Sequence, residues 1–111
     1  MNIVFKSVKF ERECNRQALL VRHHGLQRAK SIRRRLDDLR AAPNLATMQF
    51  LPGRCHELKG NRAGQLSIDL DGPYRLIFRV ANIPVPAKGD GGLDWLGVTS
   101  IEILDVEDTH E

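Results

Sequence analysis

Residues 65–80 read QLSIDLDGPYRLIFRV, which is two alternating segments joined by an Asp-Gly pair. Successive side chains of a β-strand point to opposite faces, so Leu66, Ile68 and Leu70 share one face of the first segment. An Asp-Gly pair between two such segments is typical of a tight hairpin turn, although Pro73 directly after it leaves the turn type open. The stretch therefore predicts an antiparallel hairpin with one buried face.

The second segment of this hairpin places arginines on the other, open face. Its core residues are expected to be Tyr74, Leu76, Phe78 and Val80. Arg75 and Arg79 then lie on the open face with Ile77, near the basic residues upstream, which are Arg54, Lys59 and Arg62. Guanidinium and ammonium groups bind phosphate, so the open face is predicted to bind anions. Arginines that merely keep an exposed sheet face soluble are an equally good interpretation of the pattern alone.

The rest of the chain predicts a single α+β domain over residues 1–111. An N-terminal strand, a helical hairpin on one side, and an antiparallel sheet of three further strands are expected. The segments are a strand at 3–7, helices at 8–23 and 26–42, a Pro- and Gly-rich connection at 83–97, and a last strand at 99–106. Gly25 is expected to separate the helices, and Pro43 to end the second one. Each helix is expected to bury an apolar stripe at helical spacing. The stripe residues are Phe10, Cys14, Ala18 and Val21 in the first helix, widened by Leu19 and Leu20, and Leu26, Ala29, Ile32, Leu36 and Leu39 in the second.

Charge is divided unevenly along the chain. The net charge is +3, but residues 1–79 carry 16 Lys and Arg against 7 Asp and Glu, whereas residues 80–111 carry 1 against 7. A basic body favours a polyanion such as nucleic acid, or an acidic protein, while solvated helix faces explain part of the excess. No apolar run approaches membrane-spanning length and the start does not resemble a signal peptide, so we expect a cytoplasmic protein with no membrane contact. Cys14 and Cys55 are expected to be free thiols.

Two histidines suggest metal-free chemistry on RNA. An imidazole can take a proton from a ribose 2′-hydroxyl or give one to a leaving 5′-oxygen, so His56 and His110 are candidate base and acid. Asp108 could orient an imidazole, and Lys59 with the arginines could offset transition-state charge. A structural His56, a disordered His110 or metal ligation by these residues are the alternatives. No motif predicts a metal site or a cofactor.

Four motifs occur in a fixed order in the second half of the chain. They are HELKGNRAG from His56 to Gly64, LSI from Leu66, YRLIF from Tyr74, and EDTH from Glu107. The series resembles the HigB branch of the RelE/ParE toxin superfamily, whose members show His-x-Leu-Lys-Gly-x-Arg-x-Gly, Trp-Ser-Ile, aromatic-Arg-Ile-x-Phe and a closing Asp-Tyr-His. The N-terminal half agrees only in the order of its elements.

The resemblance implies a ribosome-dependent mRNA endoribonuclease of a type II toxin-antitoxin module. It implies a helix-turn-helix antitoxin of the HigA kind as partner, and a higher-order complex with it on operator DNA. The family's catalytic positions fall on His56, Lys59, Arg75, Asp108 and His110. RNA-binding roles are expected for Arg54, Arg62 and Arg79.

The sequence also departs from the family pattern. Thr109 replaces the family's aromatic residue and cannot stack on a base, so base orientation comes from elsewhere or activity is weaker. Leu66 replaces Trp on the core side, and the 83–97 connection is longer than the usual hairpin, with partner contact as one interpretation. Two other functions stay open, a ParE-like inhibitor of DNA gyrase and a non-catalytic RNA-binding module.

Overall fold

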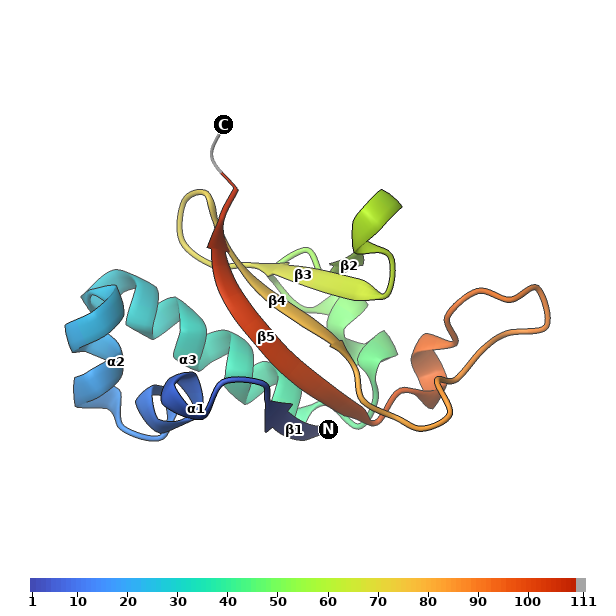
Figure 1. Cartoon of the computed structure of the whole chain (residues 1–111), viewed down its shortest axis with the longest axis horizontal. Coiled ribbons are helices and arrows are strands. Elements are labelled where there is room, and N and C mark those ends of the chain that lie inside the picture. The colour runs from blue at the N-terminus through green and yellow to red at the C-terminus, as the bar shows by residue number, and fades with distance from the viewer. Residues whose placement is uncertain (110–111) are drawn as a thin grey trace.

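A computed structural model describes residues 1–109 and confirms the predicted α+β class. Figure 1 shows the helices gathered at one end and a long, twisted sheet beside them. The strands are β1 Asn2–Phe5, β2 His56–Glu57, β3 Gln65–Asp69, β4 Tyr74–Val80 and β5 Ser100–Asp108. The helices are α1 Val8–Cys14, α2 Gln17–His24 and α3 Leu26–Ala41, and three short 3-10 turns are η1 Leu45–Phe50, η2 Gly60–Arg62 and η3 Trp95–Gly97.

The five strands form one mixed sheet in the order β1-β5-β4-β3-β2. The predicted antiparallel strands β3, β4 and β5 lie at its centre. β1 adds to β5 in parallel, with Asn2 opposite Ser100, because the helices between β1 and the rest of the sheet act as a crossover. The two-residue β2 was not predicted as a separate strand, and it pairs with β3 at the free edge.

The predicted helix over 8–23 is wrong in one respect, because it is two helices. Asn15 ends α1, and Arg16 takes an extended conformation with φ −136° and ψ 103° before α2 starts. Asn competes with the helix through its own side chain and so favours helix ends. Because of this break, α2 does not continue the apolar face of α1. Ala18, which the predicted stripe places in the core, is exposed, and Leu20 is fully buried instead.

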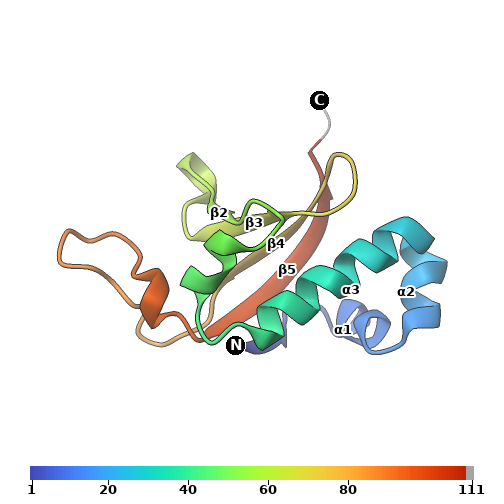
Figure 2. The ribbon, with the colours of Figure 1, turned by 180° about the vertical axis from the view of Figure 1, so that it is seen from behind.

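The core lies between α3 and the back of the sheet, where α3 crosses the strands (Figure 2). The stripe predicted on α3 is confirmed at Ala29, Ile32, Leu36 and Leu39, all 0% exposed. Leu26 begins the helix and is 58% exposed, so it does not belong to the core. None of the helices within residues 1–109 is both long and apolar enough to cross a bilayer.

Residues 81–99 form the predicted long connection between β4 and β5, which we call the arm. It projects from the sheet as the excursion at the right of Figure 1. Ala87 and Leu93 make an isolated antiparallel bridge within it, and the Asp94 amide donates to the Pro86 carbonyl at 3.0 Å. The arm is therefore a folded hairpin rather than an irregular loop.

Candidate functional site

The strand register defines three rows of side chains on the open face of the sheet, opposite α3. Residues directly opposite each other in an antiparallel pair share a face. The first row is His56, Ser67, Ile77 and Asp105, the second is Asp69, Arg75 and Glu107, and the third is Gln65, Arg79 and Glu102. The rows bring predicted site residues from β2 and β4 onto the same surface.

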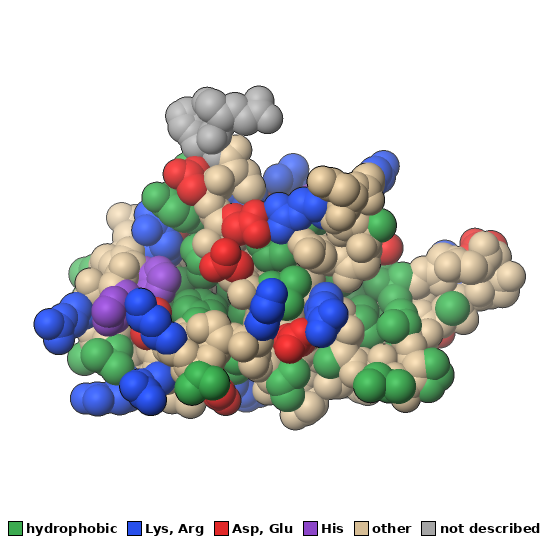
Figure 3. All heavy atoms as spheres, in the orientation of Figure 1, with side chains coloured by type: hydrophobic (Ala, Val, Ile, Leu, Met, Phe, Trp, Pro, Cys, Tyr) green, Lys and Arg blue, Asp and Glu red, His purple; other side chains and the backbone are tan. Residues whose placement is uncertain are grey.

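The arginines of this surface are already paired with carboxylates. Arg75 Nε lies 2.9 Å from Asp69 Oδ1, and Arg54 Nε lies 3.3 Å from Asp69 Oδ2. Arg79 Nε donates to Glu102 Oε1 at 2.5 Å, across the strand pair. Acidic and basic side chains accordingly lie next to one another over the sheet (Figure 3). The predicted anion-binding face is thus largely neutralised from within.

Arg62 makes the most extensive of these contacts. Its two terminal nitrogens donate to Glu107 Oε1 and Oε2, each at 2.7 Å, and Nε and Nη2 donate to Gln65 Oε1 at 3.0 and 2.8 Å. This hydrogen bonding from Arg62 lowers the pKa of Glu107, and the same contact raises the pKa of Arg62. We call Arg62, Gln65 and Glu107 the Arg62 bridge.

The Arg62 bridge corrects the prediction that Ile77 is on an open surface. Gln65 belongs to β3 and Glu107 to β5, so a side chain that joins them passes over β4 between them, at the level of Ile77. Ile77 is 2% exposed and its neighbour Ser67 is 3% exposed. Part of the face that the alternation predicts as open is therefore closed.

His56 stands at the edge of this face in a defined orientation. Its Nδ1 lies 2.8 Å from the Arg54 carbonyl oxygen. A carbonyl oxygen only accepts, so Nδ1 carries the hydrogen, and in the neutral ring the lone pair is on Nε2. Arg54 has φ 51°, a left-handed conformation that few non-glycine residues adopt, and this turn directs its carbonyl to the ring.

The turn before His56 requires glycine at its first position. Gly53 has φ +115°, and a Cβ there would lie 2.7 Å from Ile68 Cγ1 and 2.9 Å from Arg35 Nε. The chain passes so close to the core that no side chain fits. The close packing of Gly53 therefore fixes the position of the turn, and with it the start of β2 at His56.

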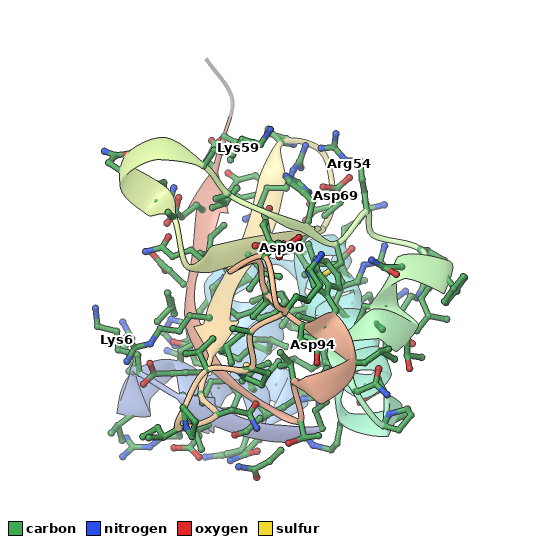
Figure 4. The ribbon with its side chains drawn as sticks, turned by 90° about the vertical axis from the view of Figure 1, so that its right-hand side faces the viewer. Lys6, Arg54, Lys59, Asp69, Asp90 and Asp94 are labelled. Carbon is green, nitrogen blue, oxygen red and sulfur yellow. The ribbon has the colours of Figure 1, made fainter. Side chains whose placement is uncertain are left out.

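Lys59 is the cation of this region with no ion-pair partner among residues 1–109. It precedes η2 and is exposed, and Figure 4 shows it at the same end of the sheet as Arg54 and Asp69. Its ammonium group is available to an incoming anion without breaking an existing contact.

Asp108 does not lie where the motif suggests. It pairs with Tyr74, which packs on the core side, whereas its neighbour Glu107 pairs with Arg75 on the open face. Neighbouring strands are about 4.8 Å apart, so β5 is also roughly 14 Å from β2 and His56. No motif assigns a role to Glu107, although the period-2 spacing from Glu107 back to Asp105 could have indicated its face.

The chain after Asp108 is tied to the hairpin turn. The Thr109 amide and hydroxyl both donate to the Pro73 carbonyl oxygen, at 2.9 and 2.7 Å. His110 lies outside the described residues, so its predicted role as acid stays a prediction. Within residues 1–109, no three His, Cys, Asp or Glu side chains approach closely enough to hold a metal ion.

A second group of titratable side chains, which sequence reasoning missed, lies between α1, α2 and β5. Glu13 is 6% exposed, and its Oε1 lies 2.8 Å from His24 Nε2. Arg28 stacks on Tyr74, with Cζ 3.3 Å from the ring centroid. Both pairs line a hollow of about 270 Å³ next to Asp105. Each of these four side chains already contacts another side chain of the protein, so we assign the group a structural role, which is to hold the helices against the sheet.

The cations of the helices differ from those of the sheet in having few acidic partners. Seven have no ion-pair partner within the described part of the chain: Lys9, Arg12, Arg16, Arg22, Lys30, Arg34 and Arg40. The unneutralised positive charge predicted for residues 1–79 is therefore concentrated on the helices.

Both cysteines are free, as predicted. Burial raises the pKa of the Cys14 and Cys55 thiols to about 12. Neither thiol is therefore suited to act as a nucleophile near neutral pH.

Comparison with known proteins supports the fold and nothing finer. No protein family and no curated protein matches the chain. Among solved structures, the YoeB/ParE toxin from Agrobacterium tumefaciens is similar with a TM-score of 0.58, 18% identity and complete coverage of both chains. A chain of the YoeB-YefM complex from Staphylococcus aureus is similar with a TM-score of 0.58 and 17% identity, covering 100% of this chain and 98% of that one. The chain thus has the fold of YoeB/ParE toxins over its whole length.

Proposed function

We propose that this protein is the toxin of a type II toxin-antitoxin module and that it cleaves mRNA on the ribosome. The observation that carries the proposal is the orientation of His56, whose Nδ1 is held by the Arg54 carbonyl so that Nε2 is available as a base. The fold shared with YoeB/ParE toxins over the whole chain supports the toxin assignment. The four sequence motifs support the HigB branch.

The proposed reaction needs no metal. His56 Nε2 removes the proton of the ribose 2′-hydroxyl, O2′ forms a bond to phosphorus, and the bond from phosphorus to O5′ breaks. The products are a 2′,3′-cyclic phosphate and a 5′-hydroxyl, whose proton comes from a general acid. We assign that acid to His110, as the motif implies, and give Asp108 no role in the step because it pairs with Tyr74 and not with the open face. Lys59 and Arg75 would stabilise the additional charge on the phosphoryl oxygens.

RNA binding to this face has to compete with internal ion pairs. Arg54 and Arg75 share Asp69, and Arg79 is held by Glu102. Phosphate groups would replace these carboxylates one at a time, while Lys59 provides a first contact that costs no ion pair. We therefore assign initial capture of the RNA to Lys59 and tighter binding to Arg54, Arg62 and Arg79.

A protein that cuts mRNA in its own cell needs an inhibitor. The fold neighbour from Staphylococcus aureus is part of a YoeB-YefM complex, which supports an antitoxin as the partner of this chain as well. We propose a helix-turn-helix antitoxin of the HigA kind, a further complex of both proteins on operator DNA, and a cytoplasmic location.

Primer extension on mRNA in a translating extract tests this proposal. His56→Ala should lower the cleavage rate about 10² to 10⁴-fold, the usual loss when a positioned base is removed. His23→Ala is the matched control, because His23 is an exposed histidine on α2 with no described contact. Cleavage by His56→Ala at the rate of the control would refute the role of His56.

Two other functions are each favoured by one observation. Similarity to a YoeB/ParE toxin leaves inhibition of DNA gyrase open, and blocked supercoiling with intact mRNA would establish it. The unpaired cations on the helices favour a non-catalytic RNA-binding module. Strongly salt-dependent RNA binding without cleavage would establish that function instead.

A further inference from the structure

Exposed apolar side chains gather at the end of the molecule formed by the arm. Seven large hydrophobic residues within residues 1–109 are exposed, and four of them lie on the arm or on the neighbouring η1. These four are Phe50 at 84%, Ile83 at 98%, Val85 at 55% and Leu96 at 71% exposed. Figure 3 shows apolar side chains clustered at this end. We call these four residues the apolar end.

The arm holds the apolar end in a fixed position. The Asn82 side chain accepts from the Thr99 and Ser100 amides, both at 3.0 Å, which closes the base of the arm. Trp95 Nε1 donates to Glu57 Oε2 at 3.0 Å, which ties the arm to β2. Gly97 packs so closely that a Cβ there would lie 2.8 Å from Pro86 Cβ. An ordered segment that presents apolar side chains to water is typical of a protein-binding surface.

A groove runs between the arm and the sheet beside the apolar end. Its volume is about 210 Å³, and its walls include Leu66, Val80, Val85 and Leu93. Glu57 and Arg79 also line it. A space of this size and polarity can take one or two aliphatic side chains of a partner.

Charge around the groove favours a basic partner. Lys88 is paired with Asp90 at 3.9 Å, and Arg79 with Glu102. Glu57 and Asp94 have no cationic partner among the described residues. In a two-fold dimer this patch would face the same patch of the second copy, so unpaired carboxylates would meet unpaired carboxylates, which is unfavourable. A different protein with Lys or Arg beside its apolar residues fits better.

We propose that the arm and the groove are the docking site of the antitoxin, through a segment that has aliphatic side chains flanked by Lys or Arg. This inference rests on the proposed function for the identity of the partner. Glu57 in the groove wall directly follows His56 in β2. Gln65 and Arg79 in the same wall belong to the open face, so a segment seated in the groove would cover that end of the face proposed to bind RNA.

Binding of the small protein encoded by the reading frame next to this one tests the inference. The probe is that protein, titrated calorimetrically into this chain. Ile83→Asp with Leu96→Asp should weaken binding by about 100-fold or more, because each removes a buried aliphatic contact worth about tenfold. Val8→Asp is the matched control at the other end of the molecule, with the same 71% exposure as Leu96, and should change binding less than about twofold.

The outcomes separate this inference from the proposed function. Equal binding by the double variant and the wild type would overturn the docking site, whatever the activity. A dimer of the wild type in sedimentation velocity that is absent in the double variant would also overturn the docking site. The occupant of the groove would then be a second copy of this chain. If the wild type binds the neighbour-encoded protein through the arm but cuts no mRNA, the docking site stands and the endoribonuclease proposal fails. The double variant should keep the wild-type melting temperature, since both side chains are exposed.

Discussion

Replacing Glu107 by Gln should weaken the fold and strengthen RNA binding at the same time. Glu107 receives two hydrogen bonds from Arg62, each 2.7 Å long. Gln keeps the shape of the side chain but removes its charge, so the two-point ion pair is lost and at most one hydrogen bond remains, from the guanidinium to the amide oxygen. Arg62 is then free to bind a phosphate.

The effect on stability follows from the exposure of the pair. The side chains of Arg62 and Glu107 are 37% and 30% exposed, so solvent screens much of their attraction. Partly exposed ion pairs contribute up to about 1 kcal/mol to the free energy of unfolding. The pair of Arg62 and Glu107 is expected near that limit, because two guanidinium nitrogens bond to two carboxylate oxygens. A double-mutant cycle with Arg62→Gln should therefore give a coupling of about 1 kcal/mol at neutral pH.

The pH dependence of this coupling has a definite sign. Arg62 lowers the pKa of Glu107, so the stabilisation is complete above the pKa of an unfolded glutamate, near 4.3. It is lost as the pH falls through the lowered pKa of the folded protein. Urea unfolding at about pH 7 and at about pH 2 should show the coupling at the first pH and none at the second.

Binding of single-stranded RNA should change in the opposite direction. If the carboxylate competes with phosphate by about 1 kcal/mol, its removal should tighten binding about fivefold. One added phosphate contact should also steepen the dependence of log K on log salt by about 0.7. Fluorescence anisotropy on a labelled oligoribonucleotide at several salt concentrations measures both quantities.

Asp105→Asn is the matched control for this experiment. Asp105 lies on the same face and has the same charge, but among residues 1–109 it acts on Arg62 only through a longer-range Coulomb interaction, with no hydrogen bond or ion pair. It should tighten RNA binding slightly by removing repulsion, with no change in the salt slope. If Glu107→Gln and Asp105→Asn behave alike, the Arg62 bridge does not restrain RNA binding and the reasoning is refuted.

Two further predictions concern the turn before β2 and the two thiols. Gly53→Ala should lower the free energy of unfolding by more than about 1 kcal/mol, since its φ is +115° and the methyl group would lie 2.7 Å from Ile68, whereas Arg54→Gly should be nearly neutral at φ 51°. Urea unfolding of both variants checks this, and equal losses would contradict it. Burial raises the pKa of Cys14 and Cys55 to about 12, so both thiols should resist a disulfide reagent at about pH 8 until denaturant is added. The same shift predicts stability that is complete below the thiol's unfolded pKa and falls as the pH rises toward 12.

Local periodicity was enough to predict most of the fold. Alternation over residues 65–80 identified the central hairpin, and the stripe on α3 identified the helix face that is buried. Both are short-range patterns that repeat with the geometry of the element itself.

Sequence alone left the pairing between distant elements undetermined. Whether Glu107 or Asp108 meets Arg75 depends on the register of β5 against β4, and a shift by one residue moves every side chain to the other face. Ile77 is buried in the folded sheet, where Arg62, 15 positions earlier in the chain, joins β3 to β5 on either side of β4. The sequence thus determined which side chains are available to a phosphate-binding face, and the tertiary structure decided that most of them are first bound to one another. The physical reason is that ion pairs form between residues that only the folded sheet brings within 4 Å.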